Sequence, residues 1–266
     1  MTAAGVKTVA ITGGTRGIGL GLARALLDAG HQVAVCGTDP GRIERVRTEL
    51  PDALVVAADV TDRDQLQKFW DAGCERFGGI DIWINNAGIS HDRTGAWELS
   101  AHTAEAVVST NLLGAMHGSA VAITGMAAAG GGHVWNMEGL GSDGRIVTGL
   151  GLYGASKRAV TYLTQALAKE VPEGVSVGRL SPGMVVTDLL THGYSEDELG
   201  KVRKIMNILA DRVETVTPWL AEKAVSQTRN GAHVRWLTTP KIAARFALAP
   251  VRRRDLFATN DIPTSA

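Results

Sequence analysis

The chain lacks most features that mark secreted and nucleic-acid-binding proteins. Its 266 residues include only two cysteines, Cys36 and Cys74. Two thiols are too few for a disulfide framework or a cysteine zinc site, so we interpret both as core residues of a protein from a reducing compartment. The 27 basic and 27 acidic residues cancel, which leaves no basic excess to bind nucleic-acid phosphates. We therefore expect no nucleic-acid partner.

Long apolar runs and targeting signals are also missing from the pattern. No run of about 18 apolar residues occurs, so we expect no integral membrane segment. The first residues lead into a strand without a charged and then apolar stretch, and we expect no signal peptide and a cytoplasmic location. His, Cys, Asp and Glu form no group with metal-ligand spacing, so no metal is predicted.

Glycine and alternating secondary structure dominate what is present. The chain has 32 glycines, many at the ends of apolar runs. Short β-branched runs alternate with amphipathic stretches, which predicts βαβ units. The expected fold class is α/β: one Rossmann-type, doubly wound parallel sheet of about seven strands, with helices on both faces and residues 1–266 in one domain. The expected strands cover 8–11, 32–36, 54–58, 80–84, 133–137, 176–180 and 233–237, and the expected helices cover 17–29, 41–50, 63–77, 104–128, 153–170 and 196–220.

Residues 187–230 differ from the rest of the chain in their sequence pattern, which is polar and helical and includes no predicted strand. We predict that this segment is an excursion of the same domain that covers one end of the sheet and holds substrate. We expect a group of apolar residues in this covering segment or near the nicotinamide, and most of them are expected simply to pack against the core. They are Trp97, Met137, Leu152, Met184, Leu189, Tyr194, Met206, Ile208, Leu209, Trp219 and Leu220.

A glycine-rich loop follows the first strand and leads directly into a helix. Glycines let a pyrophosphate approach the backbone, and the helix N-terminus offers unpaired N–H groups and a positive dipole end. A strand-to-helix turn without a ligand is the alternative, because a lone glycine loop is weak evidence. The candidate phosphate-binding residues are Gly13, Thr15, Arg16, Gly17, Ile18 and Gly19.

The end of the second strand predicts which dinucleotide binds. An NAD site places a carboxylate there for the ribose 2′-hydroxyl, but the chain has Gly37 followed by Thr38. Since Arg16 in the loop can reach a phosphate, NADP(H) is favoured over NAD(H). Asp39 opposes this prediction, because its carboxylate would repel a 2′-phosphate if it turned inward, and Arg16 could instead be a solvated surface residue.

Later segments resemble the classical short-chain dehydrogenases/reductases in order and spacing. The resemblance covers residues 7–190 and implies an NAD(P)-dependent oxidoreductase acting on a small-molecule carbonyl or alcohol. The segments that carry it are Asp59-Val60, Asn85-Asn86-Ala87-Gly88, Asn111, Tyr153-Gly154-Ala155-Ser156-Lys157 and Ser181-Pro182-Gly183.

The resemblance implies a catalytic role for Tyr153, Lys157 and Asn111. Tyr153 and Lys157 are four residues apart on an expected helix and share one face. An ammonium beside a phenol lowers the phenol pKa, so Tyr153 would exchange a proton with the substrate oxygen. Lys157 would also hold the nicotinamide ribose, and Asn111 would hold a relay water. By themselves, the pair could also be exposed residues of an amphipathic helix.

The resemblance also assigns cofactor contacts outside the glycine loop. Asp59 and Val60 would lie at the adenine, other residues would lie at the adenosine ribose, and others again at the nicotinamide carboxamide. The residues at the adenosine ribose would be Asn85, Asn86, Ala87 and Gly88, and those at the carboxamide Pro182, Gly183, Val185 and Thr187.

The chain departs from the family pattern at the catalytic serine. After the fifth strand the pattern is Asn-x-Ser-Ser, whereas the chain has Asn136-Met137-Glu138-Gly139. We predict that Ser142 supplies the missing hydroxyl. The alternatives are backbone N–H groups near Gly139 or Leu140, or a hydrogen-bonding role for Glu138, which could equally be a solvated loop acid.

Residues 136–142, 180–190 and 237–240 resemble the chlorophyll(ide) b reductases, which reduce a formyl group with NADPH. The predicted function is an NADP(H)-dependent carbonyl reductase for a bulky aromatic or tetrapyrrole aldehyde or ketone. A secondary-alcohol dehydrogenase and a non-catalytic NADP-binding or sensing protein are the alternatives. Small residues on the long helices favour a homodimer or homotetramer, and Arg252–Arg254 is predicted to be a solvated patch.

Overall fold

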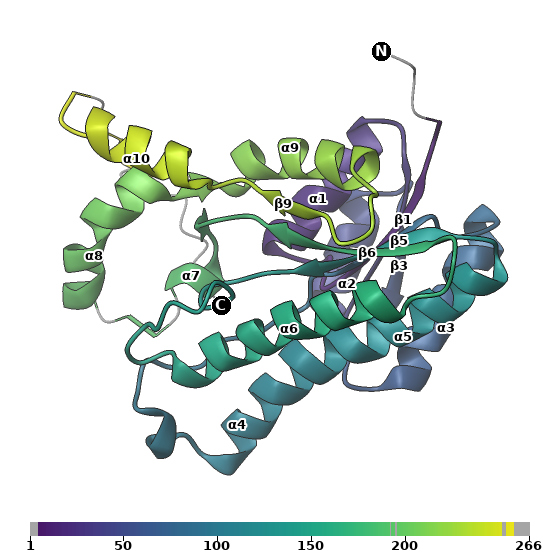
Figure 1. The fold of residues 1–266 in the computed structure, drawn as a ribbon, viewed down its shortest axis with the longest axis horizontal. Coiled ribbons are helices and arrows are strands. Elements are labelled where there is room, and N and C mark those ends of the chain that lie inside the picture. The colour runs from purple at the N-terminus through teal and green to yellow at the C-terminus, as the bar shows by residue number, and fades with distance from the viewer. Residues whose placement is uncertain (1–4, 192, 195, 252–253, 258–266) are drawn as a thin grey trace.

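The computed structural model describes residues 5–191, 193–194, 196–251 and 254–257 (Figure 1). Its centre is a seven-stranded sheet in the order β3-β2-β1-β4-β5-β6-β9, and all neighbouring strands are parallel. The chain crosses from β3 back past β1 to β4, which is the doubly wound arrangement. The expected fold class is confirmed. The strands are β1 (Thr8–Thr12), β2 (Gln32–Gly37), β3 (Leu54–Ala57), β4 (Ile82–Asn85), β5 (Gly132–Met137), β6 (Val175–Ser181) and β9 (His233–Arg235).

Helices cover both faces of this sheet (Figure 1). The core on one face joins the sheet to α1 (Gly17–Asp28), α2 (Pro40–Glu49) and α9 (Val213–Ser226). The core on the other face joins it to α3 (Arg63–Phe77), α5 (Gly114–Ala128) and α6 (Gly151–Glu170). Because both faces are covered, β1 is buried along its whole length and is apolar at its centre.

The ends of α3 show how local sequence signals set an element. The Asp62 carboxylate accepts hydrogen bonds from the backbone N–H groups of Asp64 and Gln65 at the helix start. Gly78 follows the last helical residue with φ 85°, a left-handed conformation that glycine adopts at low cost. Both helix ends agree with the range expected from the sequence.

The long helix expected over 104–128 is interrupted. It consists of α4 (Ala101–Val108), a π turn η2 (Ser109–Leu113) and α5. By length and composition, Ala101–Ala128 is the one described stretch that could cross a membrane, with 44% of its most apolar window buried. Its second half packs against α3, β4 and β5 as a core helix does. The π turn carries Asn111, and such turns often mark functional sites.

The expectations for residues 187–230 need correction. The helix expected over 196–220 is broken into α8 (Glu196–Leu209), strand β8 (Asp211–Arg212) and α9, because the Asp211 N–H pairs with the Met184 carbonyl. Strand β8 then lies parallel to β7 (Val185–Val186). Helix α9 belongs to the core, where Leu220 is fully buried against α1. The excursion is therefore limited to α7 (Asp188–Thr191) and α8.

The C-terminal part adds helix α10 (Thr239–Leu248), which lies beside α8 and extends away from the sheet (Figure 1). Arg254 beyond it is not a solvated residue as expected. Its guanidinium donates to Asp211 Oδ1 at 2.7 Å and to the Ile208 carbonyl at 3.4 Å. Buried Asp211 needs this positive charge together with Arg245, which donates to its Oδ2 at 2.6 Å. Arg252 and Arg253 lie outside the described residues.

Candidate active site

Tyr153 and Lys157 lie one turn apart in the first part of α6, and both are buried. The Lys157 Nζ is 6.0 Å from the centre of the Tyr153 ring. Gly139, in the loop after β5, lies directly against both side chains: a Cβ placed there would be 2.5 Å from Tyr153 Oη and 3.2 Å from Lys157 Cε. The phenol and the ammonium therefore meet at the carboxyl end of the sheet, where open α/β folds bind ligands.

The π turn η2 directs Asn111 to the same point. Its carboxamide accepts from the Ile89 N–H at 2.8 Å, and its Nδ2 donates to the Ile89 carbonyl at 2.9 Å and to Ser156 Oγ at 3.0 Å. A Cβ on Gly88 would lie 3.2 Å from both Asn111 Oδ1 and Lys157 Nζ. The structure therefore brings together Tyr153, Lys157 and Asn111, and it places Gly88, which was expected at the adenosine ribose, beside them.

Burial sets the protonation states of this pair. It raises the pKa of Tyr153 to about 12, whereas the sequence led us to expect a pKa lowered by the neighbouring ammonium. It lowers the pKa of Lys157 to about 8, a shift that the negative charge of Glu138 partly opposes. At neutral pH the phenol is therefore protonated, which is the form required of a proton donor.

The Ser142 hydroxyl, which we predicted to replace the missing serine, has partners in its own loop and on α6. Its buried Oγ accepts from the Gly139 N–H at 3.0 Å and donates to the Lys157 carbonyl at 3.4 Å. The reason is the path of the loop, in which Gly141 has φ 95° and a Cβ would meet Gly154 Cα at 2.6 Å. In this loop Gly139 lies against the phenol oxygen, and Ser142 Oγ accepts the hydrogen bond from the Gly139 N–H.

Glu138 is a buried anion and not a solvated loop acid. It accepts from Arg179 Nη1 at 3.1 Å, from His233 Nε2 at 2.8 Å and from Thr161 Oγ1 at 3.2 Å. Burial alone would raise its pKa, but the hydrogen bonds and charges of His233 and Arg179 outweigh that effect and hold the pKa below its usual value. The partners of Glu138 thus lie on β6, β9 and α6.

His91 is a site residue to which the sequence analysis gave no role. Its ring is buried, its Nε2 accepts from the Tyr153 N–H at 3.3 Å, and its Nδ1 bonds to the Asp92 carbonyl at 2.7 Å. It thereby pairs one of the N–H groups that the first turn of α6 leaves open. No local pattern signals this contact, because the two residues are 62 positions apart.

The glycine loop is shaped for a phosphate. Gly13 and Gly17 have φ of 64° and 53°, and a Cβ on Gly19 would lie 2.3 Å from the Gly13 carbonyl oxygen. Asn86 holds the loop by donating from Nδ2 to the Thr12 and Gly13 carbonyls. Helix α1 starts here without a side-chain cap, so N–H groups at Ile18 and its neighbours face the loop unbonded to any capping side chain.

The residues expected at the carboxamide close over this loop. Thr187 is the nearest neighbour of a Cβ built on Gly17, at 3.6 Å. Arg16 Nη1 lies 3.7 Å from Asp188 Oδ2 at the start of α7. Pro182, Gly183 and Val185 lead from β6 into β7, so residues 182–188 lie beside the glycine loop.

The strand end expected at the adenosine carries no carboxylate. Gly37 is the last residue of β2, and a Cβ there would meet Thr15 Oγ1 at 2.7 Å. Asp39, two residues further on beyond Thr38, accepts from the Arg42 N–H at 2.8 Å as the N-cap of α2. Its carboxylate is therefore directed at the helix start, away from the inward orientation that would repel a 2′-phosphate.

Three of the residues expected around the adenosine have other main contacts. The Asp59 carboxylate accepts from the Thr61 N–H and Oγ1 at 2.9 and 2.8 Å. Val60 is packed into the core against Gly114, so only its main chain can face a ligand. Asn85 donates to Asn136 Oδ1 at 2.8 Å beneath the sheet edge and does not line the cofactor site. Ala87 contacts Gly13, whose Cβ would lie 2.8 Å from Ala87 Cα.

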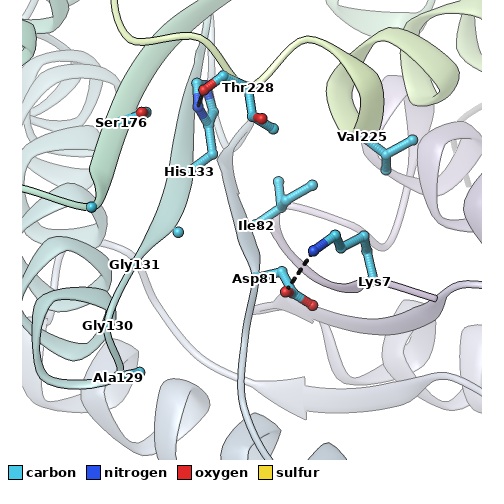
Figure 2. Close-up of a pocket in the computed structure, with 12 residues that line it drawn as sticks. Lys7, Asp81, Ile82, Ala129, Gly130, Gly131, His133, Ser176, Val225 and Thr228 are labelled. Carbon is cyan, nitrogen blue, oxygen red and sulfur yellow. Dashed lines mark hydrogen bonds and ion pairs between the residues drawn. The ribbon is translucent and has the colours of Figure 1, made fainter. Parts of the chain in front are cut away.

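A separate pocket of about 370 Å³ opens at the opposite edge of the sheet (Figure 2). It lies at the amino ends of β1, β4 and β5, where Lys7 pairs with Asp81 at 3.1 Å beside His133. It contains none of the residues described above. Among the described residues, no group of three His, Cys, Asp or Glu side chains could hold a metal ion. His192 lies outside the residues that the structure describes.

The chain matches known proteins over most of its length. The model of the short chain dehydrogenase family matches residues 7–198. A chloroplastic chlorophyll(ide) b reductase from Oryza sativa subsp. japonica is 34% identical over 271 residues, with 95% of this chain and 78% of the relative covered. An NADPH-dependent pterin aldehyde reductase from Arabidopsis thaliana is 34% identical over 189 residues, with 70% of this chain and 77% of the relative covered.

A solved structure gives the same result. The 3-ketoacyl-(acyl-carrier-protein) reductase from Brucella melitensis, crystallised with NADH, superposes with a TM-score of 0.77 at 27% identity and covers 86% of this chain and 96% of its own. The similarity to chlorophyll(ide) b reductases that the motifs indicated is confirmed. This chain belongs to the short chain dehydrogenase family of oxidoreductases.

Proposed function

We propose that the chain is an NADP(H)-dependent carbonyl reductase. The observation that carries the proposal is the buried Tyr153 phenol, protonated at neutral pH, with the Lys157 ammonium one turn away. NADPH, when bound, supplies the hydride that adds to the carbonyl carbon. Tyr153 donates its hydroxyl proton to the carbonyl oxygen, and the Lys157 charge stabilises the phenolate that this leaves. The product is an alcohol.

The cofactor-binding residues would be the glycine loop, Asn86–Gly88, Lys157 and residues 182–187. NADPH is favoured over NADH for two reasons: β2 ends at Gly37 without a carboxylate, and Asp39 is occupied as the cap of α2. Arg16 in the loop and Arg42 on α2 are the cations that could accept a 2′-phosphate. The apparent KM for NADPH should be at least about tenfold lower than for NADH, and Arg16→Ala should reduce that ratio.

The rim of the site suits a bulky apolar substrate. Trp97 and Ile146 are 87% and 93% exposed on the loops before α4 and before α6. These loops are joined where the Thr94 N–H donates to the Gly149 carbonyl at 3.2 Å. Arg93 stacks on the Tyr194 ring at 3.7 Å, which links them to the cover formed by α7 and α8. Large exposed apolar side chains around a catalytic pair favour an aromatic or tetrapyrrole aldehyde or ketone.

The test is NADPH oxidation by the purified protein with chlorophyllide b, benzaldehyde and naphthaldehyde. Turnover of the tetrapyrrole that is lost in Tyr153→Phe would support both the reaction and the substrate class. Turnover of the simple aldehydes alone would support the reductase and refute the tetrapyrrole. Oxidation of secondary alcohols without reduction of any carbonyl would favour the dehydrogenase alternative. Binding of NADPH without turnover in either direction would refute an enzymatic role.

A homodimer or homotetramer is part of the proposal. Leu113, Met116 and Tyr162 are 39%, 47% and 75% exposed on η2, α5 and α6. These helices cover the same face of the sheet, and burying such side chains against a second copy would remove them from water. Light scattering should return twice or four times the 28.0 kDa mass of one chain, and a monomer at micromolar concentration would refute this part.

A further inference from the structure

A buried charged cluster lies directly behind the catalytic lysine. Glu138 follows β5, Arg179 lies on β6 and His233 lies on β9, three neighbouring strands of the sheet. The two Glu138 oxygens divide these partners between them: Oε1 accepts from Arg179 at 3.1 Å and Oε2 bonds with His233 Nε2 at 2.8 Å. The Glu138 side chain is only 6% exposed, so its charge acts in a poorly screened environment.

The backbone around Glu138 touches Lys157 on both sides. The carbonyl of Met137 accepts from Lys157 Nζ at 3.4 Å, and Gly139 lies against the Lys157 stem. A third link runs through α6, where Thr161 Oγ1 lies 3.2 Å from Glu138 Oε1 and 3.2 Å from the Lys157 carbonyl. Lys157 therefore contacts the residues on either side of Glu138, and the Glu138 carboxylate is linked through Thr161 to the helical turn that carries Lys157.

We infer that Glu138 is a positioning residue for Lys157, whose carboxylate, held by Arg179 and His233, keeps the lysine in place as an ammonium beside Tyr153. This inference rests on the reductase function proposed above and adds to it a residue that the family pattern does not supply, since a serine normally stands at that position.

The electrostatics of the site agree with this role. Burial lowers the pKa of Lys157 to about 8, and the Glu138 charge is the group that raises it. Tyr153 faces Lys157 from its own helix and is uncharged at neutral pH, while the charged groups facing Glu138 are Arg179 on β6 and His233 on β9. Without the carboxylate, burial of Lys157 would no longer be opposed by a negative charge, and the lysine would lose its proton at a lower pH.

The first test is the pH profile of kcat/KM for the reductase reaction from about pH 6 to about pH 10. Glu138→Gln keeps the shape and a carbonyl acceptor but removes the charge, and its alkaline limb should move to lower pH by about one unit. Glu138→Asp, which keeps the charge, should restore most of the wild-type limb. The matched control is Asp211→Asn, which removes a buried carboxylate paired with Arg245 and Arg254 and should leave the limb in place. An unchanged limb in Glu138→Gln would overturn the inference.

The second test does not depend on turnover. The urea midpoints of Glu138→Gln, Lys157→Met and the double variant form a cycle. If the two charges interact, the double variant should lose less than the sum of the two single losses, and additive losses would overturn the inference. A wild-type protein that reduces no carbonyl while the cycle is non-additive would refute the proposed function and leave the charge interaction between Glu138 and Lys157 standing.

Discussion

Gly139 is the position at which the smallest substitution should have the largest effect on catalysis. A Cβ added there would lie 2.5 Å from Tyr153 Oη and 3.2 Å from two carbons of the Lys157 stem. Non-bonded carbon and oxygen atoms settle at about 3.5 Å, so the phenol oxygen must move by about 1 Å in Gly139→Ala. The Tyr153 ring is buried and cannot swing freely, which directs that displacement into the proton-donating hydroxyl.

A misplacement of about 1 Å in a catalytic group can cost about 100-fold in rate. We therefore expect kcat of Gly139→Ala to fall by about 100-fold, while the Kd for NADPH, measured by fluorescence titration, changes less than about threefold. Overpacking should also lower the free energy of unfolding by about 1–3 kcal/mol. Gly139→Ser should fare no better than the alanine variant, although it creates the serine that the family pattern has.

The matched control is Gly151→Ala. This glycine begins α6, the helix that carries Tyr153, but its Cβ would find Ala96 Cβ at an ordinary 3.6 Å. Its kcat should stay within about twofold of the wild type, because the added methyl displaces nothing. Wild-type kcat in Gly139→Ala, or recovered activity in Gly139→Ser, would refute the reasoning.

Three further outcomes follow from the same geometry. Ser142→Ala leaves the buried Gly139 N–H without its acceptor and should lower the free energy of unfolding by about 1–3 kcal/mol in a urea titration; a variant as stable as wild type would contradict this. The folded-state pKa of Lys157 is lowered from 10.5 to about 8, so folding releases a proton between those pH values. The stability of the wild type relative to Lys157→Met should therefore rise as pH increases through that window, while reductase activity falls. Stability and activity that change in the same direction would contradict this. His91→Ala removes the acceptor of the Tyr153 N–H and should lower kcat more than it raises KM for NADPH; equal changes in both would mean that His91 acts on cofactor binding.

The fold could be predicted from the sequence because its signals are local. β-branched runs such as the one at β1 and amphipathic periods such as that of α3 depend on neighbouring residues, and turn glycines mark their ends. The prediction went wrong where a distant contact overrides the local period. The sequence pattern predicts a continuous helix over 196–220, yet the helix breaks at Asp211. The Asp211 N–H pairs with the Met184 carbonyl, and its carboxylate binds Arg245 in α10 and Arg254 after α10.

The candidate site divides in the same way. The relation of Tyr153 to Lys157 follows from helical spacing, and the glycine loop follows from its place between a strand and a helix. The partners of Ser142 could not be predicted, because its distance along the chain does not say on which side of the loop its hydroxyl lies. That side depends on Gly141 packing against Gly154, a contact between two glycines that leaves no side-chain pattern in the sequence.

The sequence by itself therefore determined the order of most elements, the glycine loop between β1 and α1, and the spacing that puts Tyr153 and Lys157 on one face of α6. Only the tertiary structure decided that Gly139 lies against the phenol, that His91 bonds to the first turn of α6, and that Glu138 is buried with Arg179 and His233. The physical reason is that local backbone preferences act over a few residues, whereas burial, pKa shifts and buried ion pairs depend on which distant strands and helices meet.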